Sequence, residues 1–187
     1  MTRAQLAPLT LQQFLDRPEI KPASEYHTGE VLQKPMPQGK HSYLQSELTA
    51  RINAVLRKPR IACAGTELRC TFGDRSIVSD IAVFAWENIP RDPDGSVANQ
   101  FDRAPDWTIE ILSPDRQPTR PTKNILHCLD FGCELGWLID PEDLTVFVHT
   151  TDRRTQYFDR PGDRLLVPSF AKGLELTVQD LIDSLWD

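Results

Sequence analysis

Two carboxylates, Asp80 and Glu110, each interrupt a short apolar run that has the composition of a buried β-strand. Asp80 lies in the run Ser-Asp-Ile-Ala-Val-Phe at 79–84, and Glu110 lies in Asp-Trp-Thr-Ile-Glu-Ile-Leu at 106–112. Runs rich in β-branched and aromatic residues predict strands. Carboxylates on neighbouring buried strands repel each other and resist leaving water, unless a positive group lies between them. A divalent cation is the usual group of this kind, because hard cations take oxygen ligands.

The elements that must position these carboxylates are predicted by hydrophobic period and by turn residues. Apolar residues at helical spacing predict a helix over 41–57, and a second helix is expected over 123–131, closed by Gly132. Strands are expected over 61–71, 76–86, 106–112 and 135–139. The order helix, strand, strand, strand, helix, strand predicts an α/β (α+β) core over about 41–140, with a mixed central sheet.

Shorter elements are expected on both sides of this core. An N-terminal helix at 9–16 and an extended hairpin at 24–33 precede it. A meander follows, with strands near 145–150, 154–158 and 164–167, before a last helix at 177–185. At 187 residues the chain is expected to be one domain over 1–187, with 1–40 and 141–187 as additions to the core.

Composition excludes several classes of protein. Hydrophobic residues make up 40% and charged residues 26%, as in soluble globular proteins. No apolar run reaches the roughly 20 residues that cross a bilayer, and the N-terminus has no secretory pattern, so a cytoplasmic location is expected. The net charge of −6 disfavours non-specific binding to nucleic acid, although a local basic patch remains compatible with it.

The four cysteines are expected to be reduced and mostly buried thiols. A zinc site built from them and His127 is disfavoured, because the spacings of Cys63, Cys70, Cys128 and Cys133 include no Cys-x-x-Cys pair.

The order of elements, with Asp80 in one strand and Glu110 in the next, resembles that of the PD-(D/E)xK nuclease superfamily. Within it the chain resembles the bacterial Uma-type family, which is described as "putative restriction endonuclease". The resemblance covers nearly the whole chain. The matching parts are Gly29-Glu30, His41 before a long helix, 79–83, 110–114, Lys123, Gly132, 135–141 and 174–176.

Two residues depart from the superfamily pattern. Ser79 stands where a proline precedes the first acid, which affects backbone stiffness more than chemistry. Leu112 stands where a lysine follows the second acid. In some branches that lysine has moved to the following helix, and the resemblance assigns Lys123 to that role.

The resemblance implies cleavage of DNA phosphodiester bonds with Mg²⁺, or Mn²⁺, as cofactor. Asp80 and Glu110 are then the metal ligands, and the backbone carbonyl of Ile111 is a further one. Lys123 would orient the attacking water or stabilise the negative charge of the transition state. Arg120 and Arg116 are candidates for binding the flanking phosphates.

Three other residues are supporting candidates, and two of them have a simpler alternative. Glu67 is either a further acid or a solvated residue on the polar face of its strand. His41 is either part of the site or a polar residue at a helix N-terminus. Glu30 matches a family position without an assigned role.

Two other functions fit the same sequence. A catalytically silent nucleic-acid-binding or interaction module could share the fold, since fold does not prove function. A metal-dependent small-molecule phosphodiesterase is also compatible, and a closed acidic pocket rather than an open groove would favour it. A homodimer is expected if the protein cuts both strands of DNA, because one small domain carries one site.

Overall fold

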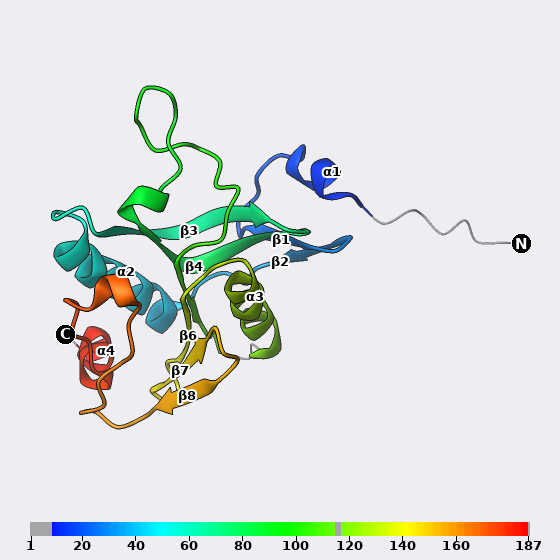
Figure 1. The fold of residues 1–187 in the computed structure, drawn as a ribbon. Helices are drawn as coiled ribbons and strands as arrows, with labels where there is room; N and C mark the ends of the chain where they lie inside the picture. The colour runs from blue at the N-terminus through cyan, green and yellow to red at the C-terminus, as the bar shows by residue number, and fades with distance from the viewer. Residues whose placement is uncertain (1–8, 115–116, 187) are drawn as a thin grey trace, which may run out of the picture.

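The computed structural model describes residues 9–114 and 117–186 of the chain, and Figure 1 shows their arrangement. The helices in this part are α1 (Leu11–Leu15), α2 (Gly39–Leu56), α3 (Thr119–Asp130) and α4 (Val178–Trp186). The strands are β1 (Ser24–His27), β2 (Glu30–Gln33), β3 (Ala62–Phe72), β4 (Arg75–Ala85), β5 (Trp107–Ile111), β6 (Leu135–Asp140), β7 (Thr145–Thr150) and β8 (Thr155–Phe158). No helix of 9–114 or 117–186 is long and apolar enough to cross a membrane.

The predicted fold class is confirmed. The eight strands described form a single sheet in the order β2-β1-β4-β5-β6-β7-β8, with β3 paired to the remaining edge of β4. The sheet is mixed, because β5 and β6 run parallel with α3 as their crossover, whereas the other pairs are antiparallel. The predicted order of helices and strands in the core is also observed.

The third strand predicted for the C-terminal meander, at 164–167, is wrong. This segment makes only an isolated bridge between Arg164 and Thr177. Its alternating pattern reflects the burial of Leu165 in the core rather than pairing along an edge of the sheet. The Leu165 N–H donates to the Leu176 carbonyl, so the segment is anchored to the chain that leads into α4.

Two hydrophobic clusters form the core. The first lies under α2 and α4 and includes Leu44, Leu48 and Ile52 of α2, which form the predicted helical stripe. The second lies under α3 and includes Ile125 and Leu112. In Figure 1, α2 and α4 lie together on one side of the sheet, and α3 is separate from them. Strands β4 and β6 contribute side chains to both clusters, which explains their almost continuous apolar sequences.

Strand β4 has two neighbours along one of its edges. Strand β1 pairs with its start, at Ser76, and β5 pairs with its later part, from Ile81 onward. Strand β3 pairs along the whole of the other edge. The sheet therefore divides at residues 77–80, where β1 has ended and β5 has not begun. Backbone groups at this division need hydrogen-bond partners other than a strand.

The ladder between β3 and β4 is interrupted at the same place. Every residue of β3 is paired with β4 except Glu67, which would face Asp80 and has a φ of 47°. The alternation of faces reverses across this break, since Ile81 packs in the first cluster but Ile77 packs in the second. Local kinks of this kind re-aim side chains, and here the re-aimed side chain is that of Asp80.

We predict that Gly136→Ala destabilises the protein by about 1–3 kcal/mol, because an added methyl group overpacks the core. A Cβ at Gly136 would lie 2.2 Å from Cγ2 of Ile125, a side chain fixed between α3 and β6. Urea unfolding measures the change. Gly65→Ala, also in a strand but with no atom within 4 Å of the added carbon, is the matched control and should lose no stability. Equal stability of the two variants would contradict this close packing.

Candidate active site

The ammonium group of Lys34 lies between the two carboxylates singled out in the sequence. Its Nζ is 2.5 Å from Oδ1 of Asp80 and 4.0 Å from Oε2 of Glu110. It also donates to the Val78 carbonyl at 2.7 Å. Lys34 immediately follows β2, so the N-terminal hairpin brings it to the strands that carry the acids. The positive group expected between Asp80 and Glu110 is therefore a side chain of the protein itself.

Asp80 is held on all sides. Its Oδ2 accepts a hydrogen bond from the Ile111 N–H at 2.7 Å and lies 3.1 Å from Nε2 of His41. Its main-chain carbonyl, freed by the break in the ladder with β3, accepts from the Gln45 side chain at 2.7 Å. His41 and Gln45 are four residues apart in the first turns of α2, so they share one face of the helix.

Glu25 on β1 accepts a hydrogen bond from the Val78 N–H, the backbone group at the division of the sheet that Lys34 does not contact. Its Oε1 accepts from the Val78 N–H at 3.0 Å and from the Asn124 side chain at 3.1 Å. Its Oε2 accepts from Arg120 at 2.7 Å, and Arg120 also donates to the Leu32 carbonyl. Glu25 therefore joins the hairpin, strand β4 and helix α3.

These charges stabilise one another against the cost of burial. Burial opposes the charge on Asp80, but Lys34 and the hydrogen bond from His41 outweigh it and lower the pKa of Asp80. Burial likewise opposes the charge on Lys34, but Asp80, Glu110 and Glu25 raise the pKa of Lys34 above its usual value. Asp80 and Lys34 are therefore both charged at neutral pH.

The pKa of Glu25 shows the same balance. Burial raises this pKa, but the His27 side chain 3.7 Å away, the charge of Lys34, the Val78 N–H and the charge of Arg120 together lower it to about 2. Glu25 is therefore ionised at neutral pH.

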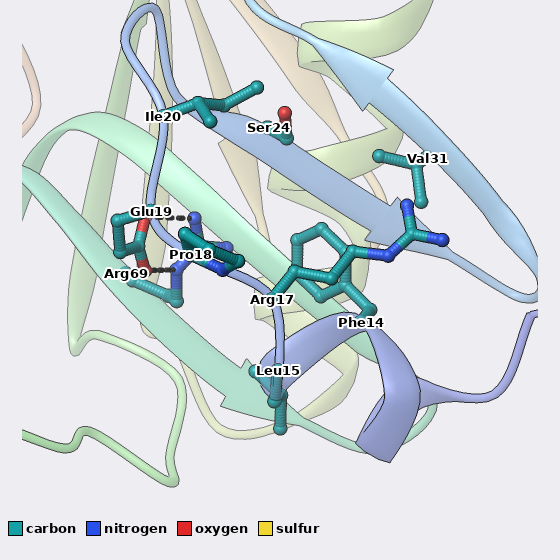
Figure 2. A pocket seen from close by; sticks show the side chains of 9 residues that line it. All are labelled: Phe14, Leu15, Arg17, Pro18, Glu19, Ile20, Ser24, Val31 and Arg69. Carbon is teal, nitrogen blue, oxygen red and sulfur yellow. Dashed lines mark hydrogen bonds and ion pairs between the residues drawn. The ribbon is translucent and has the colours of Figure 1, made fainter.

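The site is closed. Asp80 and Glu110 are 0% exposed, and Lys34 is 6% exposed. The described pockets lie elsewhere. Figure 2 shows one between α1 and the hairpin, lined by Phe14, Ile20 and Val31 and bordered by the ion pair of Glu19 with Arg69. Neither Asp80 nor Glu110 lines a described pocket.

The structure does not bring the predicted lysine, Lys123, to the acids. Lys123 is exposed on α3, and its side chain makes no hydrogen bond or ion pair with the described residues. Adjacent residues on a helix point about 100° apart. The inward position is taken by its neighbour Asn124, which is 0% exposed and contacts Glu25. The helix does face the site as predicted, but with an amide rather than an ammonium group.

The remaining candidates are spread between the site and the surface. His41 lies in the site, whereas Glu30 and Glu67 are exposed and have no described hydrogen bond through their side chains. Arg120 is paired with Glu25, which makes it an anchor for the hairpin. Arg116 lies outside the described residues. Leu112, in the lysine slot of the pattern, is buried in the second cluster.

Sequence reasoning missed Lys34, Glu25 and Asn124. Lys34 stands before Pro35 in a segment that reads as a polar loop, and nothing in one sequence separates it from a solvated lysine. Glu25 occupies an alternating strand, where a carboxylate normally faces water. Their burial follows from the division of the sheet, which only the fold reveals.

The four cysteines are free thiols, as expected, with Cys63 half-buried and the others buried. Burial raises the pKa of Cys70 and of Cys133 to about 12. Thiols with such pKa values are poor nucleophiles and metal ligands at neutral pH.

Comparison with known proteins identifies the family. Residues 11–179 match the model of Uma2, a family described as "putative restriction endonuclease". The chain belongs to the Uma2 family. A similar solved structure is that of a "putative nuclease belonging to DUF820" from Anabaena variabilis ATCC 29413. It is 57% identical, the alignment covers 95% of this chain and 99% of that one, and the TM-score is 0.93. No curated protein matches the chain.

Membership in Uma2 supports a nuclease-like function and implies a divalent metal ion. Among residues 9–114 and 117–186, no group of three or more His, Cys, Asp and Glu side chains is arranged to hold one. Two observations nevertheless fit such an ion. Asp80 and Glu110 offer the hard oxygen ligands that Mg²⁺ prefers, and the ammonium group of Lys34 shows that the space between them accepts a cation.

We predict that Lys34→Met lowers the free energy of unfolding by roughly 3–5 kcal/mol, because removing one partner leaves buried charges uncompensated. Here the buried carboxylate that loses its closest cation is that of Asp80. Lys123→Met is the matched control and should change it by less than about 0.5 kcal/mol, as expected for an exposed residue without partners. Urea unfolding at neutral pH and without metal measures both. A larger loss for Lys123→Met would contradict the described placement of the two lysines.

We also predict that acid removes the stabilisation that comes from Glu25. Because the folded state lowers its pKa from 4.5 to about 2, this stabilisation is complete above pH 4.5 and is lost as the pH falls toward 2. The difference in unfolding free energy between wild type and Glu25→Gln should therefore shrink over that interval. Urea titrations at several pH values measure it, and a difference that stays constant would show that the folded-state pKa of Glu25 is not lowered.

Proposed function

We propose that this Uma2 protein is a metal-dependent endonuclease that hydrolyses DNA phosphodiester bonds. The observation that supports it is the meeting of two acids and a lysine at the division of the sheet, on strands β4 and β5 and beside β2. Clustered acids with one cation match the roles that a hydrolytic site requires. The family description and the description of the Anabaena neighbour support the same class of reaction.

The proposed metal ligands are Asp80, Glu110 and the backbone carbonyl of Ile111, with Mg²⁺ or Mn²⁺ as the ion. When bound, such an ion polarises the phosphate and lowers the pKa of a water molecule. His41 and the Ile111 N–H fix the orientation of the Asp80 carboxylate through Oδ2. A lysine near the acids stabilises negative charge that develops on the phosphate. We assign this role to Lys34 in place of Lys123, since Lys34 is the one that contacts Asp80.

A catalytically silent interaction module is the second candidate, and the closure of the site favours it. Lys34 completes a buried ion pair with Asp80, and neither acid reaches the surface. In such a module these charges would only fix the hairpin onto the sheet. The two candidates therefore differ in whether the acids are needed for chemistry or for stability.

We predict that the protein nicks supercoiled plasmid DNA in the presence of Mg²⁺ or Mn²⁺. Asp80→Asn and Glu110→Gln should each lower the rate by about 100-fold or more, as expected when a group that stabilises the transition state is lost. Gel electrophoresis of the plasmid measures the rate for each variant. Asp102→Asn removes a carboxylate that is exposed and makes no described side-chain contact, so it is the matched control and should cut like wild type.

If the wild-type protein cuts no DNA over a range of metals and DNA sequences, the protein is better explained as a catalytically silent interaction module. The product also tests the homodimer that the sequence led us to expect. Two sites acting together yield linear plasmid, whereas a single site acting alone yields nicked circles.

A further inference from the structure

We propose that the ammonium group of Lys34 is an exchangeable cation, which a divalent ion must displace from between Asp80 and Glu110 before it can bind. Lys34 thereby weakens metal binding and holds the site together without metal. This inference rests on the proposed function, because it takes Asp80 and Glu110 as the metal ligands.

The first reason is that the two oxygens of Asp80 differ. Oδ2 accepts from the Ile111 N–H at 2.7 Å and lies 3.1 Å from His41 Nε2, so the backbone and α2 both engage it. Oδ1 is engaged by Lys34 at 2.5 Å. The Oδ1 contact is the one that a mobile side chain can release. A metal ion and the ammonium group therefore compete for the same oxygen.

The second reason is that the ammonium group and the metal ion would both bind to the same pair of negative carboxylates. Lys34 lies within 4.0 Å of Asp80 and Glu110 together, and these are the carboxylates proposed to hold the metal. Two cations between one pair of carboxylates repel each other strongly in a buried site, where water does not screen them. Occupation by one of them therefore opposes occupation by the other.

The third reason is that the Lys34 side chain can move while its backbone stays in place. Its backbone N–H is fixed to the Ala23 carbonyl, but the charge is carried on a flexible four-carbon stem. The next residues, Pro35 and Met36, are exposed and belong to no helix or strand. Lys34 is also slightly exposed, whereas Asp80 and Glu110 are fully buried. Movement of this side chain releases Oδ1 of Asp80 without unfolding the hairpin.

The test is a titration of the full chain with Mn²⁺, in which electron paramagnetic resonance measures the free ion. Lys34→Met removes the competing charge and keeps the length of the side chain, so its Kd for Mn²⁺ should be at least about tenfold lower than that of wild type. Lys40→Met removes a nearby exposed lysine, paired with Glu142 at 3.0 Å, and controls for net charge. Its Kd should stay within about twofold of wild type. Adding Asp80→Asn to Lys34→Met should abolish the tight binding, which places the ion at this site.

A Kd for Lys34→Met equal to or higher than that of wild type overturns the inference while leaving the metal site standing. Absence of Mn²⁺ binding in both proteins overturns the proposed metal site and the inference with it. If Lys34→Met does not fold, nuclear magnetic resonance of ¹⁵N-lysine-labelled wild type decides. The Lys34 ammonium signal, protected by its contacts with Asp80 and Val78, should shift and lose protection from solvent exchange on saturation with Mg²⁺. An unchanged signal at saturation overturns the inference.

Discussion

The structure depends on a short length of backbone that has no neighbouring strand. Along one edge of β4, β1 ends before β5 begins, and the peptide groups of Val78 lie between them. Buried backbone groups without partners are costly, so this gap must be filled. Glu25 accepts a hydrogen bond from the Val78 N–H, and Lys34 donates one to the Val78 carbonyl. The division of the sheet thus requires two charged side chains in the interior.

Those two charges in turn require others. Glu25 is balanced by Arg120 from α3, and Lys34 is balanced by Asp80 and Glu110. Each partner comes from a different element, so the same contacts fix the hairpin and α3 against the central strands. A well-packed apolar group is often at least as stabilising as a buried ion pair. A network of buried charges is therefore seldom the most stable way to fill such a space, which agrees with the chemical role proposed for Asp80 and Glu110.

The sequence predicts the core well because its signals are local. The stripe of α2 and the apolar runs of β4 and β5 each identify their element without knowledge of the rest of the fold. Asp80 and Glu110 could be singled out for the same reason, since a carboxylate inside an apolar run is unusual. The other partners depend on tertiary structure. The burial of Lys34 follows from where the hairpin docks. To predict that Asn124 rather than Lys123 points inward, the rotation of α3 about its axis must be known to within one residue.

The position of Lys34, rather than Lys123, beside the acids has a physical explanation. The superfamily pattern predicts a lysine on the third strand or on the following helix. At those places Leu112 and Ile125 pack into a hydrophobic cluster. A charge cannot replace either side chain without losing that packing. Past the end of β2, the open edge of β4 supplies a carbonyl for the ammonium group. The position of the positive charge is therefore set by where the sheet leaves backbone groups unpaired, rather than by its distance along the sequence from the acids.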